Sequence, residues 1–316
     1  MRLWAQFQAW PASAVLCLTA CLTLWGAAQA QDHANAANAA DLQQAIARAM
    51  NGKAGTAVVL DVASSKVIAA YHPEAAARRV ALPGSAIKPF TLLALLESGK
   101  VNEQTALMCK RRSTVGEHKL DCTHPSVKQP LDPAAALAYS CNSYFTTVAT
   151  RLTPSELRQS FLKDGFASPS GLEPGETYGS VALASTEAEL QLQAIGEWGV
   201  QVTPLELLRA YQRLAQLSQQ PTGNLTPLFA GLEGSISYGM GHLAQPAAKM
   251  KVAGKTGTAL VEEGAWRHGW FAGYTPADKP EIVLVVFLEK GHGPTDAAGV
   301  AREIFAAYAR SRGAPR

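Results

Sequence analysis

The stretch Leu82-Pro83-Gly84-Ser85-Ala86-Ile87-Lys88-Pro89-Phe90 places a turn directly before a buried helix, and we expect the rest of the chain to be organised around it. From Phe90 an apolar run begins that is long enough for such a helix. Ser85 then lies at or near the helix start, with Lys88 on the same face about 5–6 Å away between Cβ atoms. A buried lysine that loses its proton is a suitable base for a serine hydroxyl. Taken alone, the pattern is equally typical of a serine-capped helix with a solvated lysine.

Two further polar clusters occur later in the chain. In Tyr139-Ser140-Cys141-Asn142-Ser143-Tyr144-Phe145, the polar pair Ser140 and Asn142 is expected at a helix end, from which it can face a cleft. In Ala253-Gly254-Lys255-Thr256-Gly257-Thr258-Ala259, glycines let a substrate backbone approach, while Lys255 and the hydroxyls suit a carboxylate. The cluster around Lys255 is not a phosphate-binding loop, because the earlier glycine of the Gly-x-x-x-x-Gly-Lys pattern is missing. Each cluster alone is also typical of an ordinary turn.

Taken together, the order Ser85-x-x-Lys88, Ser140-x-Asn142 and Lys255-Thr256-Gly257 resembles the penicillin-binding transpeptidases, the acyl-serine enzymes that cross-link peptidoglycan. The resemblance extends from about residue 55 to residue 305. It includes Leu131-Asp132 before the second motif and the aromatic segment from His268 to Tyr274.

The resemblance implies a role for each catalytic side chain. Ser85 would attack the carbonyl between two terminal D-alanines of a stem peptide, and Lys88 would take its proton. Ser140 would relay that proton to the leaving amine. Lys255 would keep Lys88 neutral by like-charge repulsion and would orient the terminal carboxylate of the substrate.

It also implies how the substrate is bound. Asn142 would bind the substrate amide, and Thr256, Gly257 and Thr258 would line the carboxylate end. The backbone N–H groups of Ser85 and Thr258 would form the oxyanion hole. No cofactor is implied. Beta-lactams would be covalent inhibitors, and proteins of cell-wall synthesis would be partners.

The order of the expected elements predicts an α+β fold of the beta-lactamase and transpeptidase type. Strands are expected at residues 56–62, 66–71 and 281–288, and residues 98–230 are expected to be mostly helical. Within that region Asp132-Pro133, Thr153-Pro154 and Thr203-Pro204 are each expected to open a helix. Strands from both ends of the chain would form one antiparallel sheet, with flanking helices, an inserted all-helical region and a cleft between. A single domain is expected over residues 55–316, preceded by a lead and a helix in residues 31–54.

Residues 1–30 are expected to be an export signal. They carry a single charge, Arg2, and an apolar segment that ends in Ala28-Gln29-Ala30, a small-x-small cleavage site. Two alternatives stay open: a lipid on Cys21, or an uncleaved signal that serves as a membrane anchor. All three place the mature protein outside the cytoplasm, in the periplasm or an equivalent compartment.

Composition excludes nucleic acid as a partner. The 316 residues are 47% hydrophobic and 17% charged, as in ordinary globular proteins, and the formal net charge is only +3. Lysine and arginine are scattered, so the chain has no basic stripe.

Three cysteines follow the signal. An export compartment permits disulfides, and Cys109 with Cys122 is the expected pair because the segment between them is polar and loop-like. Cys141 would then be a buried free thiol. Cys109, Cys122, His118 and His124 lack the close pairs typical of zinc ligands, so no metal site is expected.

The same three motifs serve transpeptidation, carboxypeptidation and beta-lactam hydrolysis, so the acceptor of the acyl group stays open. Fast hydrolysis needs a positioned water and base, and no motif supplies them. Glu197 remains a candidate base, since Gly196-Glu197-Trp198-Gly199 departs from the Gly-Gln-Gly usual in the family. The stretch from Gly234 to Gln245 is also atypical. A non-catalytic penicillin-binding sensor or scaffold is the alternative from another class.

Overall fold

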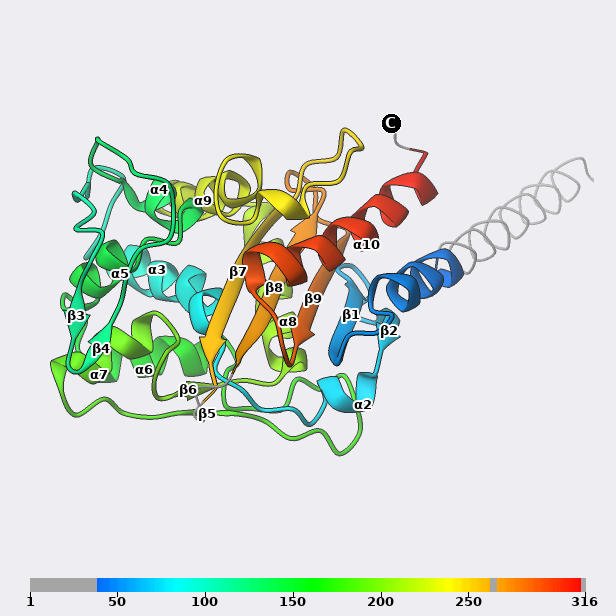
Figure 1. Cartoon of the computed structure of the whole chain (residues 1–316), viewed down its shortest axis with the longest axis horizontal. Helices are drawn as coiled ribbons and strands as arrows, with labels where there is room; N and C mark the ends of the chain where they lie inside the picture. The colour runs from blue at the N-terminus through cyan, green and yellow to red at the C-terminus, as the bar shows by residue number, and fades with distance from the viewer. Residues whose placement is uncertain (1–38, 262–265, 314–316) are drawn as a thin grey trace, which may run out of the picture.

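The computed structural model describes residues 39–261 and 266–313, and its centre is a five-stranded antiparallel sheet (Figure 1). The strand order is β2-β1-β9-β8-β7, so both ends of the described chain contribute to one sheet, as the sequence predicted. In this order β7 is an edge strand. The strands are β1 (Gly55–Asp61), β2 (Val67–Tyr71), β7 (Ala253–Leu260), β8 (Arg267–Thr275) and β9 (Ile282–Leu288).

Both faces of the sheet are covered by helices. In β9, Val283, Val285 and Phe287 face the core beneath α8 (Pro204–Ser218). The alternate residues of β9 face α10 (Ala298–Ser311) and the helix over residues 39–49, which lie together on the opposite face (Figure 1). Side chains alternate between the two faces of a strand, so a strand covered on both sides must be apolar throughout. This explains the unbroken apolar run at residues 282–288.

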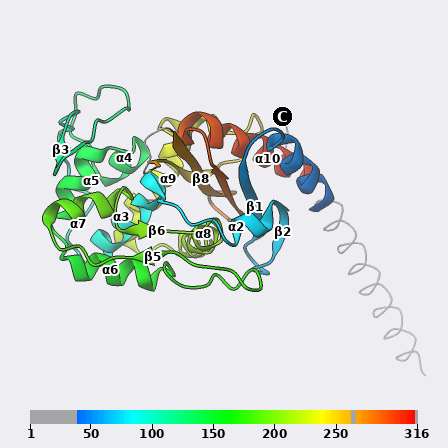
Figure 2. The ribbon, with the colours of Figure 1, turned by 60° about the horizontal axis from the view of Figure 1, so that its bottom comes forward.

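A mainly helical region lies beside the sheet (Figure 2). The expected helix starts at Asp132, Thr153 and Thr203 are confirmed, because each of these side chains caps a helix whose first residue is proline. Two short strand pairs, β3–β4 and β5–β6, interrupt the helices. Helix α2 (Pro73–Ala76) lies next to β1 instead. The remaining elements of the helical region are α3 (Lys88–Glu97), β3 (Thr114–Val115), β4 (His118–Lys119), α4 (Pro133–Ala138), α5 (Asn142–Ala149), α6 (Pro154–Lys163), β5 (Ser180–Val181), α7 (Glu187–Ala194), β6 (Val200–Gln201) and α9 (Thr226–Ser237).

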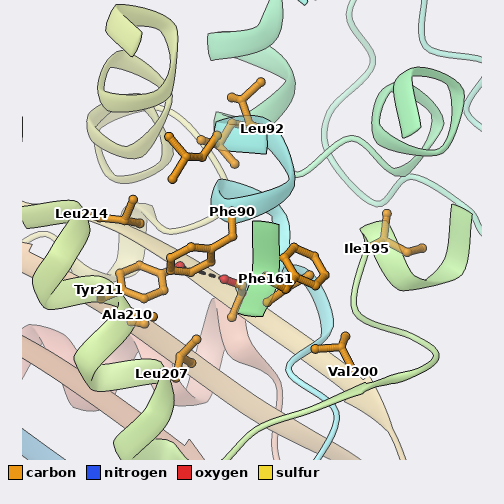
Figure 3. Packing of buried hydrophobic residues seen from close by; sticks show 14 of the residues in the cluster. Phe90, Leu92, Phe161, Ile195, Val200, Leu207, Ala210, Tyr211 and Leu214 are labelled. Carbon is orange, nitrogen blue, oxygen red and sulfur yellow. Dashed lines mark hydrogen bonds between the residues drawn. The ribbon is translucent and has the colours of Figure 1, made fainter. Parts of the chain in front are cut away.

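Helix α3 is buried on every side, and only its last residue, Glu97, escapes burial. Phe90 makes edge-to-face contacts with Phe166 and Tyr211, with ring centroids 4.9 and 5.5 Å apart (Figure 3). The Tyr211 hydroxyl donates a hydrogen bond of 2.9 Å to the carbonyl of Ala86, directly before the helix. The core therefore fixes both the helix and the turn that precedes it.

Ser85 does not cap α3. It lies within a 3-10 turn, Gly84–Ile87, and neither this turn nor α3 has a side-chain cap. The apolar packing around α3 replaces the cap, because the helix is anchored along its whole length.

The expected export signal, residues 1–30, lies outside the described residues. Within residues 39–261 and 266–313, no helix combines the length and the apolar character that a membrane crossing requires.

Replacing Phe90 with alanine is expected to lower the free energy of unfolding by about 3–5 kcal/mol, because a fully buried ring would leave a cavity. Urea unfolding followed by circular dichroism measures the loss. Leu183→Ala is the control, since that side chain is 60% exposed and should change stability by less than about 0.5 kcal/mol. Equal losses in the two variants would contradict the packing described for α3.

Candidate active site

The three sequence motifs meet at one cavity of about 520 Å³. Ser85 lines it from the turn before α3, and Ser140 and Asn142 line it from the junction of α4 and α5. Thr256 and Thr258 line it from the edge strand β7. Three segments that are far apart in sequence thus line one cavity.

Glycines let the first and third motifs touch backbone to backbone. Gly84 has a φ of +51°, and a Cβ there would lie 2.5 Å from the carbonyl oxygen of Thr258. A Cβ on Gly257 would lie 2.4 Å from the carbonyl oxygen of Pro83. Trp270 of β8 also donates a hydrogen bond of 3.0 Å to the carbonyl of Leu82. The turn that carries Ser85 is therefore held directly against β7 and β8.

Both lysines lie beneath this wall and are fully buried. Lys88 Nζ donates to the Ser140 carbonyl at 2.9 Å, to Ser140 Oγ at 3.3 Å and to Asn142 Oδ1 at 2.6 Å. Lys255 Nζ donates to Ser140 Oγ at 2.9 Å and to the Thr256 carbonyl at 2.9 Å. Ser140 has a φ of +55°, a left-handed conformation that residues other than glycine seldom adopt. One hydroxyl thus lies between two amines.

Burial changes the protonation of both lysines. It lowers the pKa of Lys88 to about 8, although negative charge at Cys141, Cys122 and Glu197 partly opposes the shift. It also lowers the pKa of Lys255 well below its ordinary value, and the charge of Lys88 lowers it further. The resemblance implied that repulsion by Lys255 keeps Lys88 neutral, whereas in the structure burial is the first cause of the lowered pKa of Lys88.

Ser85 itself is half-buried on the cavity wall, whereas the hydrogen bonds of Lys88 go to Ser140 and Asn142. Asn142 uses its Oδ1 for Lys88 and donates from Nδ2 to the Asp121 carbonyl at 3.4 Å. Its amide is therefore part of the buried network as well as of the cavity wall. Thr258 Oγ1 accepts a hydrogen bond from the backbone N–H of Gly293 at 3.0 Å.

The family model "Penicillin binding protein transpeptidase domain" matches residues 55–309. The chain belongs to this family.

The relatives whose names state a function have low sequence identity to this chain. It is 26% identical over 286 residues to a probable peptidoglycan D,D-transpeptidase PenA of Neisseria flavescens, covering 75% of this chain and 69% of the relative. It is 25% identical over 281 residues to the peptidoglycan D,D-transpeptidase MrdA of Acinetobacter baumannii, covering 71% of this chain. The match spans only 41% of that relative.

Solved structures share the fold. The D,D-transpeptidase domain of a peptidoglycan glycosyltransferase from Eggerthella lenta matches with a TM-score of 0.75 and 22% identity, covering 86% of this chain and 82% of that one. A complex between penicillin-binding protein PBP2 and MreC from Helicobacter pylori matches with a TM-score of 0.74 and 19% identity, covering 86% and 63%. The predicted α+β transpeptidase fold is therefore confirmed.

Several residues of this family member line the cavity without having been predicted. The Gly-rich turn after β9 contributes more of them than any other segment. The sequence signal for this turn was Gly291-His292-Gly293-Pro294, which follows a strong strand and is typical of a turn. Glu197, left open as a base, does line the cavity. The unpredicted lining residues are Asp121, Thr123, Met240, Arg267, His292, Pro294 and Thr295.

The expected bridge between Cys109 and Cys122 is not present, because all three cysteines of the described chain are free thiols. Cys122 Sγ instead lies 3.7 Å from Cys141 Sγ, and Cys109 Sγ lies 3.5 Å from His124 Nε2. The prediction used only the loop between the first two cysteines. It did not foresee that the loop packs onto the helix junction that carries Cys141.

Gly257→Ala is expected to lower the free energy of unfolding by about 1–3 kcal/mol, because the added methyl would overlap backbone atoms that cannot move independently. Gly299→Ala is the matched control. No atom lies within 4 Å of its Cβ position, and alanine in a helix is favoured over glycine by about 0.5–1 kcal/mol. Chemical unfolding of the two variants measures both changes. A neutral Gly257→Ala would mean that the motifs are not in backbone contact.

Proposed function

We propose that the protein is a penicillin-binding D,D-transpeptidase that acts on the D-Ala-D-Ala stem peptides of peptidoglycan through an acyl-serine intermediate. The observation that carries this proposal is that Ser140 Oγ accepts hydrogen bonds from both buried lysines in the cavity that Ser85 lines. A hydroxyl between two amines is suited to proton relay, and a half-exposed serine beside it is suited to attack.

In the proposed acylation, Ser85 Oγ attacks the carbonyl carbon between the two D-alanines and loses its proton to neutral Lys88. The backbone N–H groups of Ser85 and Thr258 stabilise the oxyanion, typically by about 3–4 kcal/mol for each donor. The proton then passes through Ser140 to the leaving D-alanine amine as the C–N bond breaks. The contact between Gly84 and Thr258 supports this pairing of donors, because it holds both backbones at the same place.

Substrate would bind along β7. An edge strand in a cleft offers unpaired backbone groups to an extended peptide. Thr256, Gly257 and Thr258 would line the end where the terminal carboxylate binds. Exposed Arg267, which lines the same cavity, supplies positive charge for that carboxylate. The amine of a second stem peptide would then attack the acyl-enzyme and complete the cross-link.

Beta-lactams would acylate Ser85 in the same way. The match to a PBP2 that is complexed with MreC supports a partner protein of cell-wall synthesis for this chain as well. To reach a peptidoglycan substrate, the protein would have to be exported. We propose that residues 1–30 direct this export, either as a cleaved signal or as a retained anchor. We propose no nucleic-acid partner.

One observation favours a second function, hydrolysis by a carboxypeptidase or beta-lactamase activity. Glu197 lines the cavity with Ser85, and burial raises the pKa of its carboxyl. A carboxylate with a raised pKa is a better base for a deacylating water. The lifetime of the acyl-enzyme distinguishes the two functions.

Covalent labelling by a fluorescent penicillin should require Ser85, because its Oγ forms the acyl bond. Intact mass spectrometry after mixing should show one added penicillin on the wild type and none on Ser85→Ala. Ser98→Ala, at the exposed far end of α3, should label normally. Labelling of Ser85→Ala would remove the nucleophile, and a labelled wild type with no activity on stem peptides would favour the penicillin-binding sensor or scaffold. An adduct lost within seconds would favour hydrolysis.

The acylation rate should rise with pH through about 8, because only the neutral amine of Lys88 accepts a proton. Below that pKa the neutral fraction falls about tenfold for each pH unit, so the rate should fall in the same proportion. Stopped-flow mixing with a chromogenic beta-lactam between pH 6 and 9 gives the profile. A flat or falling profile would exclude Lys88 as the base.

A further inference from the structure

Four possible metal ligands converge behind the active-site cavity. The side-chain ligand atoms of Cys109, Cys122, His124 and Cys141 all lie within 4.8 Å of one another, and all except Cys109 are buried. They come from two segments, residues 109–124 and the junction before α5. The transpeptidase chemistry described above uses none of these four side chains.

Two of the six spacings between these atoms match those of a tetrahedral zinc ion. With Zn–S bonds of about 2.3 Å and a Zn–N bond of about 2.0–2.1 Å, tetrahedral angles place two sulfurs about 3.8 Å apart and a sulfur and nitrogen about 3.6 Å apart. The distances are 3.7 Å between the sulfurs of Cys122 and Cys141 and 3.5 Å between Cys109 Sγ and His124 Nε2. Thiolate and imidazole ligands in a closed tetrahedron are typical of structural zinc.

Hydrogen bonds with neighbouring groups also orient three of the four ligands. His124 Nδ1 lies 2.8 Å from the Pro125 carbonyl, so Nδ1 carries the proton and Nε2 directs its lone pair toward Cys109. Backbone N–H groups of Arg111 and Ser143 donate to the sulfurs of Cys109 and Cys122 at 3.3 and 3.5 Å. Such hydrogen bonds from outside the ligand set orient ligands and stabilise thiolates.

We propose that Cys109, Cys122, His124 and Cys141 bind one zinc ion in a closed structural site, each cysteine giving up its thiol proton on binding. This departs from the expectation of no metal. That expectation considered His118, which is exposed and lies outside the cluster, and it did not consider Cys141. The proposal rests on this geometry and does not depend on the proposed transpeptidase activity.

The ion would join the segment over residues 109–124 to the second catalytic motif. Cys141 lies between Ser140 and Asn142, and Cys122 lies between Asp121 and Thr123, which both line the cavity. The Asp121 carbonyl already accepts a hydrogen bond from Asn142. Zinc would therefore fix one wall of the cavity from behind, without an open position for chemistry.

The metal content of the full chain tests the proposal. After purification without chelator, elemental analysis should find one zinc for each chain, and a chelator should release it and expose three reactive thiols. Replacing the ion with Co²⁺ should give the visible and near-ultraviolet absorption of a tetrahedral thiolate complex. Less than about 0.2 equivalents of zinc after dialysis against equimolar zinc would overturn the proposal.

Matched variants locate the site. Cys109→Ser and His124→Gln should each weaken zinc binding at least tenfold and remove or alter the Co²⁺ spectrum. His118→Gln, in the same segment but outside the cluster, should bind as the wild type does. Equal losses in His118→Gln would overturn the assignment, and so would a wild-type mass 2 Da low from a Cys122–Cys141 disulfide. If a ligand variant fails to fold, the chelator titration and the Co²⁺ spectrum of the wild type decide.

Discussion

The burial of two lysine amines against one serine hydroxyl is the constraint on which the site depends. Transferring an ammonium group into a protein interior is costly, so Lys88 and Lys255 must find buried acceptors or lose a proton. Lys88 finds them in Ser140 and Asn142 of the second motif. Lys255 finds them in Ser140 and in the carbonyl of its own neighbour Thr256. The lysines of the first and third motifs therefore both depend on the second motif.

The two hydrophobic cores make this arrangement possible. Helix α3 brings Lys88 into the interior because apolar residues surround the helix, with Phe90 packed against Tyr211 on α8. The strand β9, apolar on both faces, joins the first and last parts of the chain and so brings β7 to the edge beside that helix. At Gly84 and Gly257 the helix turn and the strand edge meet with no room for a side chain. The groups proposed as proton relay and oxyanion donors are thus positioned by packing.

The parts of the fold that sequence could predict are those with local causes. The helix starts at Asp132, Thr153 and Thr203 follow from side-chain caps and a proline at the next position, and β9 follows from its own apolar run. The motif residues at the cavity were recognisable as a set, although their hydrogen bonds and the larger effect of burial on Lys88 were not. The cysteine pairing failed because the neighbours of Cys122 are decided by tertiary packing, and sequence spacing does not report it.

The proposed metal site lies where the fold has little apolar support of its own. In the segment over residues 109–124, Val115 and Leu120 are the buried aliphatic side chains, and the β3–β4 pair is only two residues long in each strand. A short strand pair without a substantial core needs a cross-link or a metal to hold one conformation. Asp121 and Thr123 of this segment nevertheless form part of the cavity wall. Because Cys141 lies within the second motif, zinc bound to it would hold the cavity wall formed by Asp121 and Thr123 in a fixed position relative to that motif.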